Sequence, residues 1–203
     1  FWMASEDHDF KEVNHINLFG KKYEWATNQK GMVGLFNTLS VNNVCNEIKL
    51  ALGNSKNAEE ILKLFKKCYS NNTLSEATRS LVNELFGEYG IVILDAYDNQ
   101  LKELLVPVIK KDILEKRFYE LISSTSNSLS KTYKIQASVR EINFFKLSNQ
   151  KRDRIIQKSS LEDIINNSKD FSPNVLMRPL YQELILPNLA YVGGGAEIAY
   201  WMQ

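Results

Sequence analysis

The chain has 203 residues, of which 44% are hydrophobic, and a formal net charge of +1 at pH 7. This length allows one sizeable domain or a core with an insertion, and the hydrophobic content is sufficient for a buried core. The near-neutral charge excludes the basic footprint of a nucleic-acid-binding protein. No apolar run reaches the roughly 18 residues that a membrane-spanning helix requires.

The chain opens with an apolar segment, residues 1–5, that predicts a buried strand ending in a polar turn. Acidic residues and a histidine follow directly, and ligands bind at the carboxyl ends of strands in open α/β sheets. We therefore take Asp7, His8 and Asp9 as candidate catalytic residues, with His8 able to accept a proton, and Asn14 as a candidate substrate-binding residue.

Three interpretations of this polar cluster remain open. It could be a substrate-binding or acid–base site, a metal site, or a solvated loop with local caps and ion pairs. A metal site would use His8, Asp9 and either Glu12 or His15, although no H-E-x-x-H spacing is present. Two further short strands are predicted after the cluster, at residues 15–19 and 23–27, joined at Gly20.

Residues 38–90 predict three amphipathic helices, the first ending at Gly53 and the third at Gly90. Cys45 and Cys68 lie on the apolar faces of the first two. We interpret both as reduced core residues of a cytoplasmic protein rather than as a disulfide or a metal pair.

The middle of the chain predicts an α/β unit followed by a β-rich segment. Residues 91–95 are the clearest buried strand, and one long helix is expected from about Asn99 to Ser130, with Pro107 kinking it or marking its first turn. Residues 133–139, 142–147 and 153–158 read as strands, with a turn near Ser148-Asn149. Ser160 and Asp163 form a plausible capping box for a short helix that extends to Asn167.

The last 32 residues predict a helix, a strand, a glycine turn and a second helix. Ser172 is the expected N-cap of the first helix, with Pro173 at its first position and an end near Leu186. Residues 189–192 form the expected strand. The second helix should begin at Ala196, with its positive dipole end facing the glycine turn.

This segment carries the remaining candidate site residues. Arg178 could bind a carboxylate or phosphate in bidentate fashion, and its alternative role is a surface ion pair. Glycine amides and an acid at a helix N-terminus suit a cofactor, and the alternatives are a plain helix-entry turn and an interaction of the acid with the helix dipole. The candidates are Asn174, Arg178, Tyr181, Gln182 and Asn188 for substrate, and Gly193, Gly194, Gly195 and Glu197 for a cofactor.

Four segments resemble a known family, the bacillithiol-biosynthesis cysteine-adding enzymes. They are FWMASEDHDFKEVNH at 1–15, LFGEYGIVILDAYDNQLKELLVPV at 85–108, REINFF at 140–145 and SPNVLMRPLYQELILPNLAYVGGGAEIAYW at 172–201. The resemblance implies a cytoplasmic bacterial ligase that joins the carboxyl group of cysteine to the amine of glucosaminyl-malate. It also implies a Rossmann-like core similar to class I nucleotidylyltransferases, and homodimers formed through a C-terminal coiled coil.

We therefore expect an α/β protein with a partial Rossmann-like core, a largely helical insertion and a small β-rich insertion. The core is expected in residues 1–25, 85–131 and 169–203, and the insertions in residues 26–84 and 132–168. By fold analogy, ATP or ADP is the expected cofactor, and no protein-bound metal is expected. The expected partners are cysteine and glucosaminyl-malate, with no nucleic acid and no membrane.

The chain departs from the family pattern in three places. A glycine-rich N-terminal block and the coiled coil are missing, and Ser138-Val139 replace the family's His-Pro pair. We therefore expect an internal fragment that is inactive and monomeric by itself. Two other functions remain open, namely a metal-dependent hydrolase or amidase centred on His8, Asp9 and His15, and a non-catalytic nucleotide-binding module.

Overall fold

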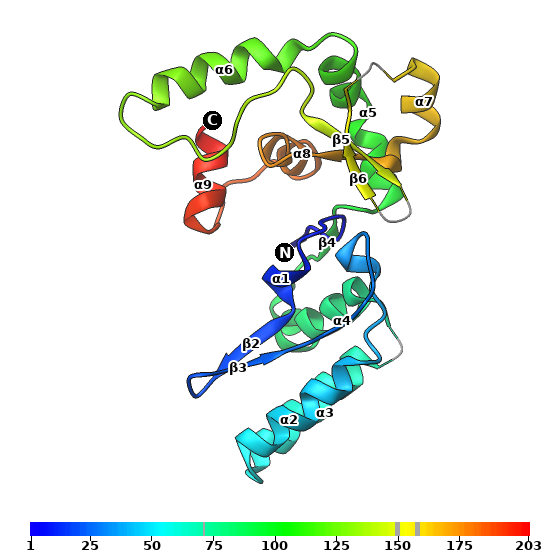
Figure 1. Ribbon diagram of the computed structural model, residues 1–203, viewed down its shortest axis with the longest axis vertical. Helices are drawn as coiled ribbons and strands as arrows, with labels where there is room; N and C mark the ends of the chain where they lie inside the picture. The colour runs from blue at the N-terminus through cyan, green and yellow to red at the C-terminus, as the bar shows by residue number, and fades with distance from the viewer. Residues whose placement is uncertain (71, 149–150, 157–158) are drawn as a thin grey trace. The chain divides into compact units, whose positions relative to one another are not determined.

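The computed structural model describes residues 1–70, 72–148, 151–156 and 159–203, and it divides into two compact units (Figure 1). The first unit comprises Phe1–Tyr97, and the second comprises Asp98–Ser148 and Arg152–Gln203. Each contains both helices and strands, in agreement with the predicted α/β class.

The first unit contains a short parallel strand pair. Strand β1 (Trp2–Met3) pairs with β4 (Leu94–Asp95), and Met3 lies opposite Asp95. The predicted strand at 91–95 is therefore confirmed only in its last two residues, and its expected burial is wrong, because Val92 is 61% exposed. Because the strands are parallel, their carboxyl ends share one edge, where the Ser5 hydroxyl donates to Asp95 Oδ1.

A hairpin forms at Gly20 as predicted, but its second strand begins and ends earlier than the predicted residues 23–27. Strand β2 (His15–Leu18) pairs antiparallel with β3 (Lys21–Glu24). Phe19 and Gly20 form the turn with φ values of 51° and 78°, the left-handed pair that a two-residue hairpin turn requires. At the base of the hairpin, the Trp25 N–H donates to the Asn14 carbonyl oxygen at 2.7 Å.

Three predicted helices are confirmed as α2 (Val41–Leu52), α3 (Lys56–Tyr69) and α4 (Leu74–Phe86), which pack in sequence. Helix α2 ends at Gly53 with a φ of 71°, and a capping box starts α4. An apolar cluster lies against this layer, formed by Trp25, Val33, Phe36, Val41 and Cys45. Cys45 and Cys68 are buried free thiols, as predicted.

The single long helix predicted between Asn99 and Ser130 is wrong. Two helices, α5 (Asn99–Ile113) and α6 (Arg117–Leu129), replace it, because the chain turns at Lys116 with a φ of 53°. Pro107 lies inside α5 rather than in its first turn. Helix α5 is the centre of the second unit and packs against α6, against β5 (Phe144–Ser148) and against the C-terminal elements.

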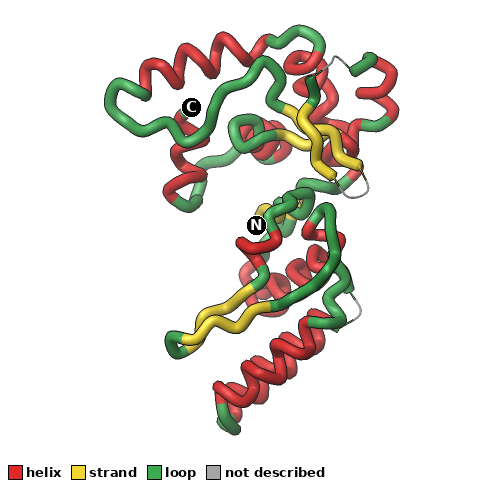
Figure 2. The backbone as a smooth tube through the Cα atoms, viewed as in Figure 1, coloured by secondary structure: helices red, strands yellow, loops and turns green. Residues whose placement is uncertain are grey.

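The second unit contains a three-stranded sheet in the order β6-β5-β7, with β6 at Lys151–Arg154 and β7 at Phe171–Pro173. The β-rich prediction holds for β5 and for the last two residues of β6, whereas β7 was not predicted and residues 133–139 form a loop that Figure 2 shows in green after α6. The predicted turn at Asn149 and the last two residues of the predicted strand at 153–158 lie outside the described residues. Helix α7 (Leu161–Asn166) has half of the predicted capping box, since Ser160 Oγ accepts from the Asp163 N–H, whereas the Asp163 carboxylate accepts from Lys146 and Asn167.

Two elements predicted near the C-terminus are wrong. Ser172 is not an N-cap but lies in β7 opposite Phe145, and helix α8 begins only at Arg178 and ends at Ile185. The strand predicted at 189–192 is a loop whose Leu189 and Val192 side chains are exposed. Helix α9 (Gly195–Met202) forms where predicted. No helix in the described part of the chain is long and apolar enough to cross a membrane.

Candidate functional site

The first candidate region follows strand β1. A turn brings the Asp7 N–H within 3.1 Å of the Ala4 carbonyl oxygen, and Glu6 beside it is 1% exposed. His8 Nδ1 lies 3.1 Å from the Glu6 carbonyl oxygen. Asp9 occupies the N-cap position of the short helix α1 (Phe10–Val13) without capping it through its side chain. The turn therefore holds the predicted acids and the imidazole next to each other at a strand end.

A second loop, which contains Val33 and Gly34, is hydrogen-bonded to this turn. The Val33 N–H donates to the Asp7 carbonyl oxygen at 2.8 Å, and the Gly34 N–H donates to the Ser5 carbonyl oxygen at 2.9 Å. A Cβ atom at Gly34 would lie 2.3 Å from Ser5 Cβ and 2.7 Å from the Ser5 carbonyl oxygen. Only glycine fits this approach. The prediction missed Gly34, whose one visible signal is a glycine within an apolar run.

The other polar residues of this region have structural roles. The Asn14 side chain donates to Glu24 Oε1 at 2.9 Å and to the Trp25 carbonyl oxygen at 3.3 Å, and both bonds close the hairpin. His15 lies on β2, with its Nδ1 atom 3.2 Å from Asn14 Oδ1. Among the described residues, no three His, Cys, Asp or Glu side chains are grouped to hold a metal ion.

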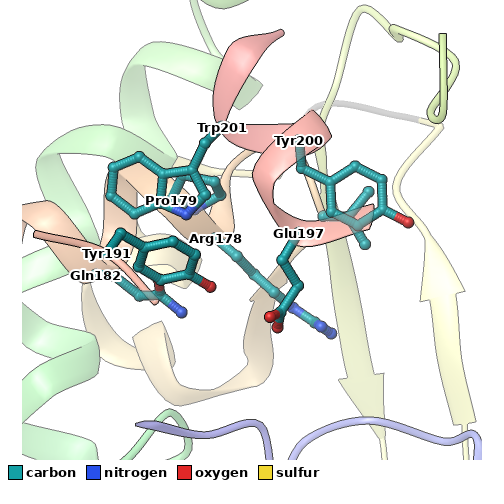
Figure 3. A pocket seen from close by; sticks show the side chains of 8 residues that line it. Arg178, Pro179, Gln182, Tyr191, Glu197, Tyr200 and Trp201 are labelled. Atoms are coloured by element: carbon teal, nitrogen blue, oxygen red, sulfur yellow. The ribbon is translucent and has the colours of Figure 1, made fainter. Parts of the chain in front are cut away.

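The second candidate region is a small pocket within the second unit, of about 50 Å³ (Figure 3). Helices α8 and α9 and the loop between them supply most of its lining, which brings together the predicted residues Arg178, Gln182 and Glu197. The complete lining is Val175, Arg178, Pro179, Gln182, Tyr191, Glu197, Tyr200 and Trp201. We call it the Arg178 pocket.

The Arg178 pocket combines a cation, hydrogen-bond acceptors and aromatic rings. Gln182 Oε1 is buried and accepts no hydrogen bond within the described part of the chain. Glu197 accepts from the Gly194 N–H at 2.9 Å and so caps its own helix. The rings of Tyr191 and Trp201 lie 4.6 Å apart, centroid to centroid. Burial, and then the nearby Glu197 carboxylate, raise the pKa of Tyr191.

The remaining predicted residues of this unit lie outside the lining. Tyr181 is fully buried, with Lys102 Nζ 5.4 Å from its ring centroid. Asn188 is exposed and bonds twice to the Glu183 carboxylate, at 3.0 and 2.8 Å. Gly193, Gly194 and Gly195 lead into α9 next to the pocket. Its volume is far below the roughly 300–1,000 Å³ of drug-sized ligand sites, so it accommodates a small polar group rather than a nucleotide.

A buried polar network leads to the element that carries Arg178. Asp112 accepts from the Asn143 backbone N–H at 2.5 Å and from its side-chain amide at 3.1 Å. Asn143 Oδ1 in turn accepts from Asn174 Nδ2 at 3.0 Å, and Asn174 Oδ1 accepts from two N–H groups just before α8. Burial raises the pKa of Asp112 to about 6, against the opposing effect of the Asn143 hydrogen bonds.

The sequence reasoning identified Asn174 but missed Asp112 and Asn143. These partners are 31 residues apart, so no local pattern indicates their contact. The aromatic residues Tyr191, Tyr200 and Trp201 were also missed, because their types are equally common in cores.

Comparison with known proteins gives a match along the whole chain. The family model described as "Bacillithiol biosynthesis BshC, N-terminal Rossmann-like domain" matches residues 1–203. A protein of Flavobacterium psychrophilum named "Putative cysteine ligase BshC" is 46% identical over 220 residues, covering 100% of this chain and 41% of that protein. Proteins with the same name from Flavobacterium johnsoniae and Staphylococcus haemolyticus are 41% and 26% identical, with 41% and 43% of their lengths covered. The chain thus spans about two-fifths of the length of the curated relatives it matches.

Proposed function

The chain belongs to the BshC family, as its N-terminal Rossmann-like domain, and from this premise we propose that it forms part of a cysteine ligase of bacillithiol biosynthesis. Membership confirms the resemblance and the Rossmann-like class inferred from the sequence. The observation that carries the proposal is the match along all 203 residues, together with the name of a relative at 46% identity.

The proposed reaction is formation of an amide between the carboxyl group of cysteine and the amine of glucosaminyl-malate. A free carboxylate does not form an amide in water without activation, so we propose ATP as the activating cosubstrate on chemical grounds. The Arg178 pocket is too small for a nucleotide. In this proposal, ATP therefore does not bind in the Arg178 pocket.

The Arg178 pocket suits the malate part of the acceptor substrate. A guanidinium group binds a carboxylate through two parallel hydrogen bonds, and Gln182 Oε1 offers a buried acceptor for a hydroxyl or amine donor beside it. Tyr191 and Trp201 add flat apolar surface against which a sugar ring can pack. In this proposal Arg178 orients the substrate through its carboxylates.

In the first unit, His8 is the proposed general base. Deprotonation of the attacking amine requires an acceptor with a pKa close to neutral, and imidazole meets this requirement. His8 Nδ1 is held near the Glu6 carbonyl oxygen, which fixes the orientation of the ring. We propose that the carboxylates of Asp7 and Asp9 interact electrostatically with the substrate beside His8.

The test uses a protein that carries this chain at the length of its relatives. It is incubated with cysteine, glucosaminyl-malate and ATP, and mass spectrometry determines whether the amide forms and whether AMP or ADP accompanies it. We expect Arg178→Ala to raise KM for glucosaminyl-malate by about tenfold or more, and His8→Ala to lower kcat by about 10²-fold or more.

Arg117→Ala is the matched control, because Arg117 is exposed at the start of α6. Its kinetic constants should equal those of the parent protein. Full activity in both His8→Ala and Arg178→Ala would refute the assigned roles. Absence of amide from the parent protein would instead favour the non-catalytic module. Two further parts of the proposal, a cytoplasmic location and homodimeric assembly of the longer protein, rest on the family resemblance alone.

A further inference from the structure

A second hollow in the second unit lies where the segment before β5 meets the end of β6. Its volume is about 190 Å³, and none of its lining residues lines the Arg178 pocket. Two arginines, two asparagines and a set of apolar side chains surround it, and we call it the Arg140–Arg154 groove. The complete lining is Arg140, Glu141, Ile142, Asn143, Phe144, Phe145, Arg154, Ile155, Ile156 and Asn174.

The groove carries excess positive charge. Arg140 and Arg154 are both exposed, and neither guanidinium has an ion-pair partner among the described residues. The one acidic residue of the lining, Glu141, is already paired with Lys116. Two cations next to one neutralised carboxylate favour a ligand with negative charge.

The other arginine of β6, Arg152, is engaged by contacts within the sheet. Arg152 donates to Ser172 Oγ at 3.2 Å and to the Pro173 carbonyl oxygen at 2.8 Å, and it lies 4.2 Å from the Phe145 ring centroid. Because side chains alternate along a strand, Arg154 lies on the same face of β6 as Arg152. Arg152 thus holds β6 against the sheet, and Arg154 is available to a ligand.

The floor of the groove is rigid and its mouth is apolar. Asn143 is 1% exposed and Phe144 is 2% exposed, and Asn143 is fixed by hydrogen bonds to Asp112 and Asn174. Ile156 at the mouth is 91% exposed. An unpaired cationic site beside apolar surface matches a small molecule that has both an oxyanion and a carbon skeleton.

We propose that the Arg140–Arg154 groove binds a small organic oxyanion, a carboxylate or a phosphate ester. The oxyanion lies between the two guanidinium groups, and the carbon part of the ligand packs against Phe145 and Ile156. This site is separate from the Arg178 pocket and does not depend on the proposed ligase reaction.

Isothermal titration calorimetry on the full chain tests the proposal. The probes are malonate for the carboxylate class and glycerol 3-phosphate for the phosphate class. At least one probe should bind. Arg140→Gln and Arg154→Gln should each lower the affinity for that probe by about tenfold or more. Arg117→Gln makes the same charge change at an exposed position of α6 and should leave the affinity unchanged. Thermal unfolding of each variant verifies that it folds.

Binding of malonate alone identifies a carboxylate site, and binding of glycerol 3-phosphate alone identifies a phosphate site. Absence of binding by both probes, binding that Arg140→Gln and Arg154→Gln leave unchanged, or an equal loss in Arg117→Gln overturns the proposal. Because no readout involves ligase activity, failure here leaves the proposed function unaffected, and the converse also holds.

A second variant tests the apolar contact. Ile156→Ala removes an exposed side chain, so the fold should be unaffected. We expect Ile156→Ala to lower the affinity for the organic probe by about threefold to tenfold and to leave the affinity for inorganic phosphate unchanged. An unchanged affinity for the organic probe would overturn the proposed packing against Ile156.

Discussion

Both units of the molecule bury apolar side chains, but the second buries more polar ones among the described residues. In the first unit the buried cluster is apolar, with Trp25, Val33 and Phe36 at its centre. In the second unit the fully buried side chains include Lys102 and Asp112, and Asn143 is nearly as inaccessible. Both units therefore gain stability from apolar burial, and the second depends more than the first on hydrogen bonds that satisfy buried polar groups.

The difference reflects how each unit joins its elements. In the first unit, helices that follow one another in the chain pack face to face. In the second, distant segments are tied by single polar side chains. Lys102 Nζ donates to the Phe171 carbonyl oxygen at 2.8 Å, and Asp112 binds the Asn143 backbone. Such bonds are directional, so they define the geometry of the segments that carry Arg178 and the Arg140–Arg154 groove.

The largest effect should come from the apolar cluster. Phe36 is 4% exposed, and its ring centroid lies 5.3 Å from that of Phe10. We expect Phe36→Ala to lower the free energy of unfolding by about 3–5 kcal/mol, because it removes a buried ring and leaves a cavity. Urea titration measures this change. Leu50→Ala, at a position that is 86% exposed on α2, should have little effect, and an equal loss there would contradict the packing argument.

A somewhat smaller effect should come from the polar network. Asn143→Ala removes the side-chain amide that donates to Asp112 and the oxygen that accepts from Asn174. Because a buried carboxylate loses one of its donors, we expect a loss of about 1–3 kcal/mol in the free energy of unfolding. The control is Asn188→Ala, which removes only one exposed side-chain hydrogen bond to Glu183. Comparable stability of the two variants would show that the network contributes little.

Asp112→Asn should cause the smallest change in the free energy of unfolding at neutral pH. It should, however, change how that free energy depends on pH. The folded pKa of about 6 exceeds the ordinary value of 3.8, so the folded state binds more protons between these values. The contribution of Asp112 to stability is therefore present at low pH and is lost as the pH rises through about 6.

We expect the asparagine variant to lack this decrease. Its net effect at pH 7 should stay within about 1–2 kcal/mol, because relief of the buried charge offsets the lost hydrogen bond. Chemical unfolding of both proteins at several pH values between 4 and 7 measures the slopes. Identical slopes would show that Asp112 does not titrate in this window.

The same contrast explains how much could be predicted from the sequence. Helices α2, α3 and α4 follow from hydrophobic periodicity because their neighbours are close in the chain. Ser172 has the local signature of an N-cap, yet its pairing with Phe145 places it in a strand. Residues 189–192 are apolar enough for a strand but do not pair with one among the described residues.

Some residues of the candidate site were also predicted from the sequence, and others were missed. Arg178, Gln182 and Glu197 stood out as polar residues in an apolar segment, and the structure places them around one pocket. Asp112 and Asn143 gave no such signal, because their roles depend on a contact between distant segments. Local patterns therefore indicated three polar side chains that line the pocket, but not the buried residues that support the segment carrying them.

Both cysteines of the chain lie in the first unit, at 2% and 0% exposure for Cys45 and Cys68. Burial also raises the pKa of Cys45, which keeps it in the unreactive thiol form. Alkylating reagents should therefore reach these sulfur atoms only after the apolar cluster and the helical layer open. The rate of thiol alkylation therefore measures how readily the first unit opens. Opening events confined to the second unit should not change this rate.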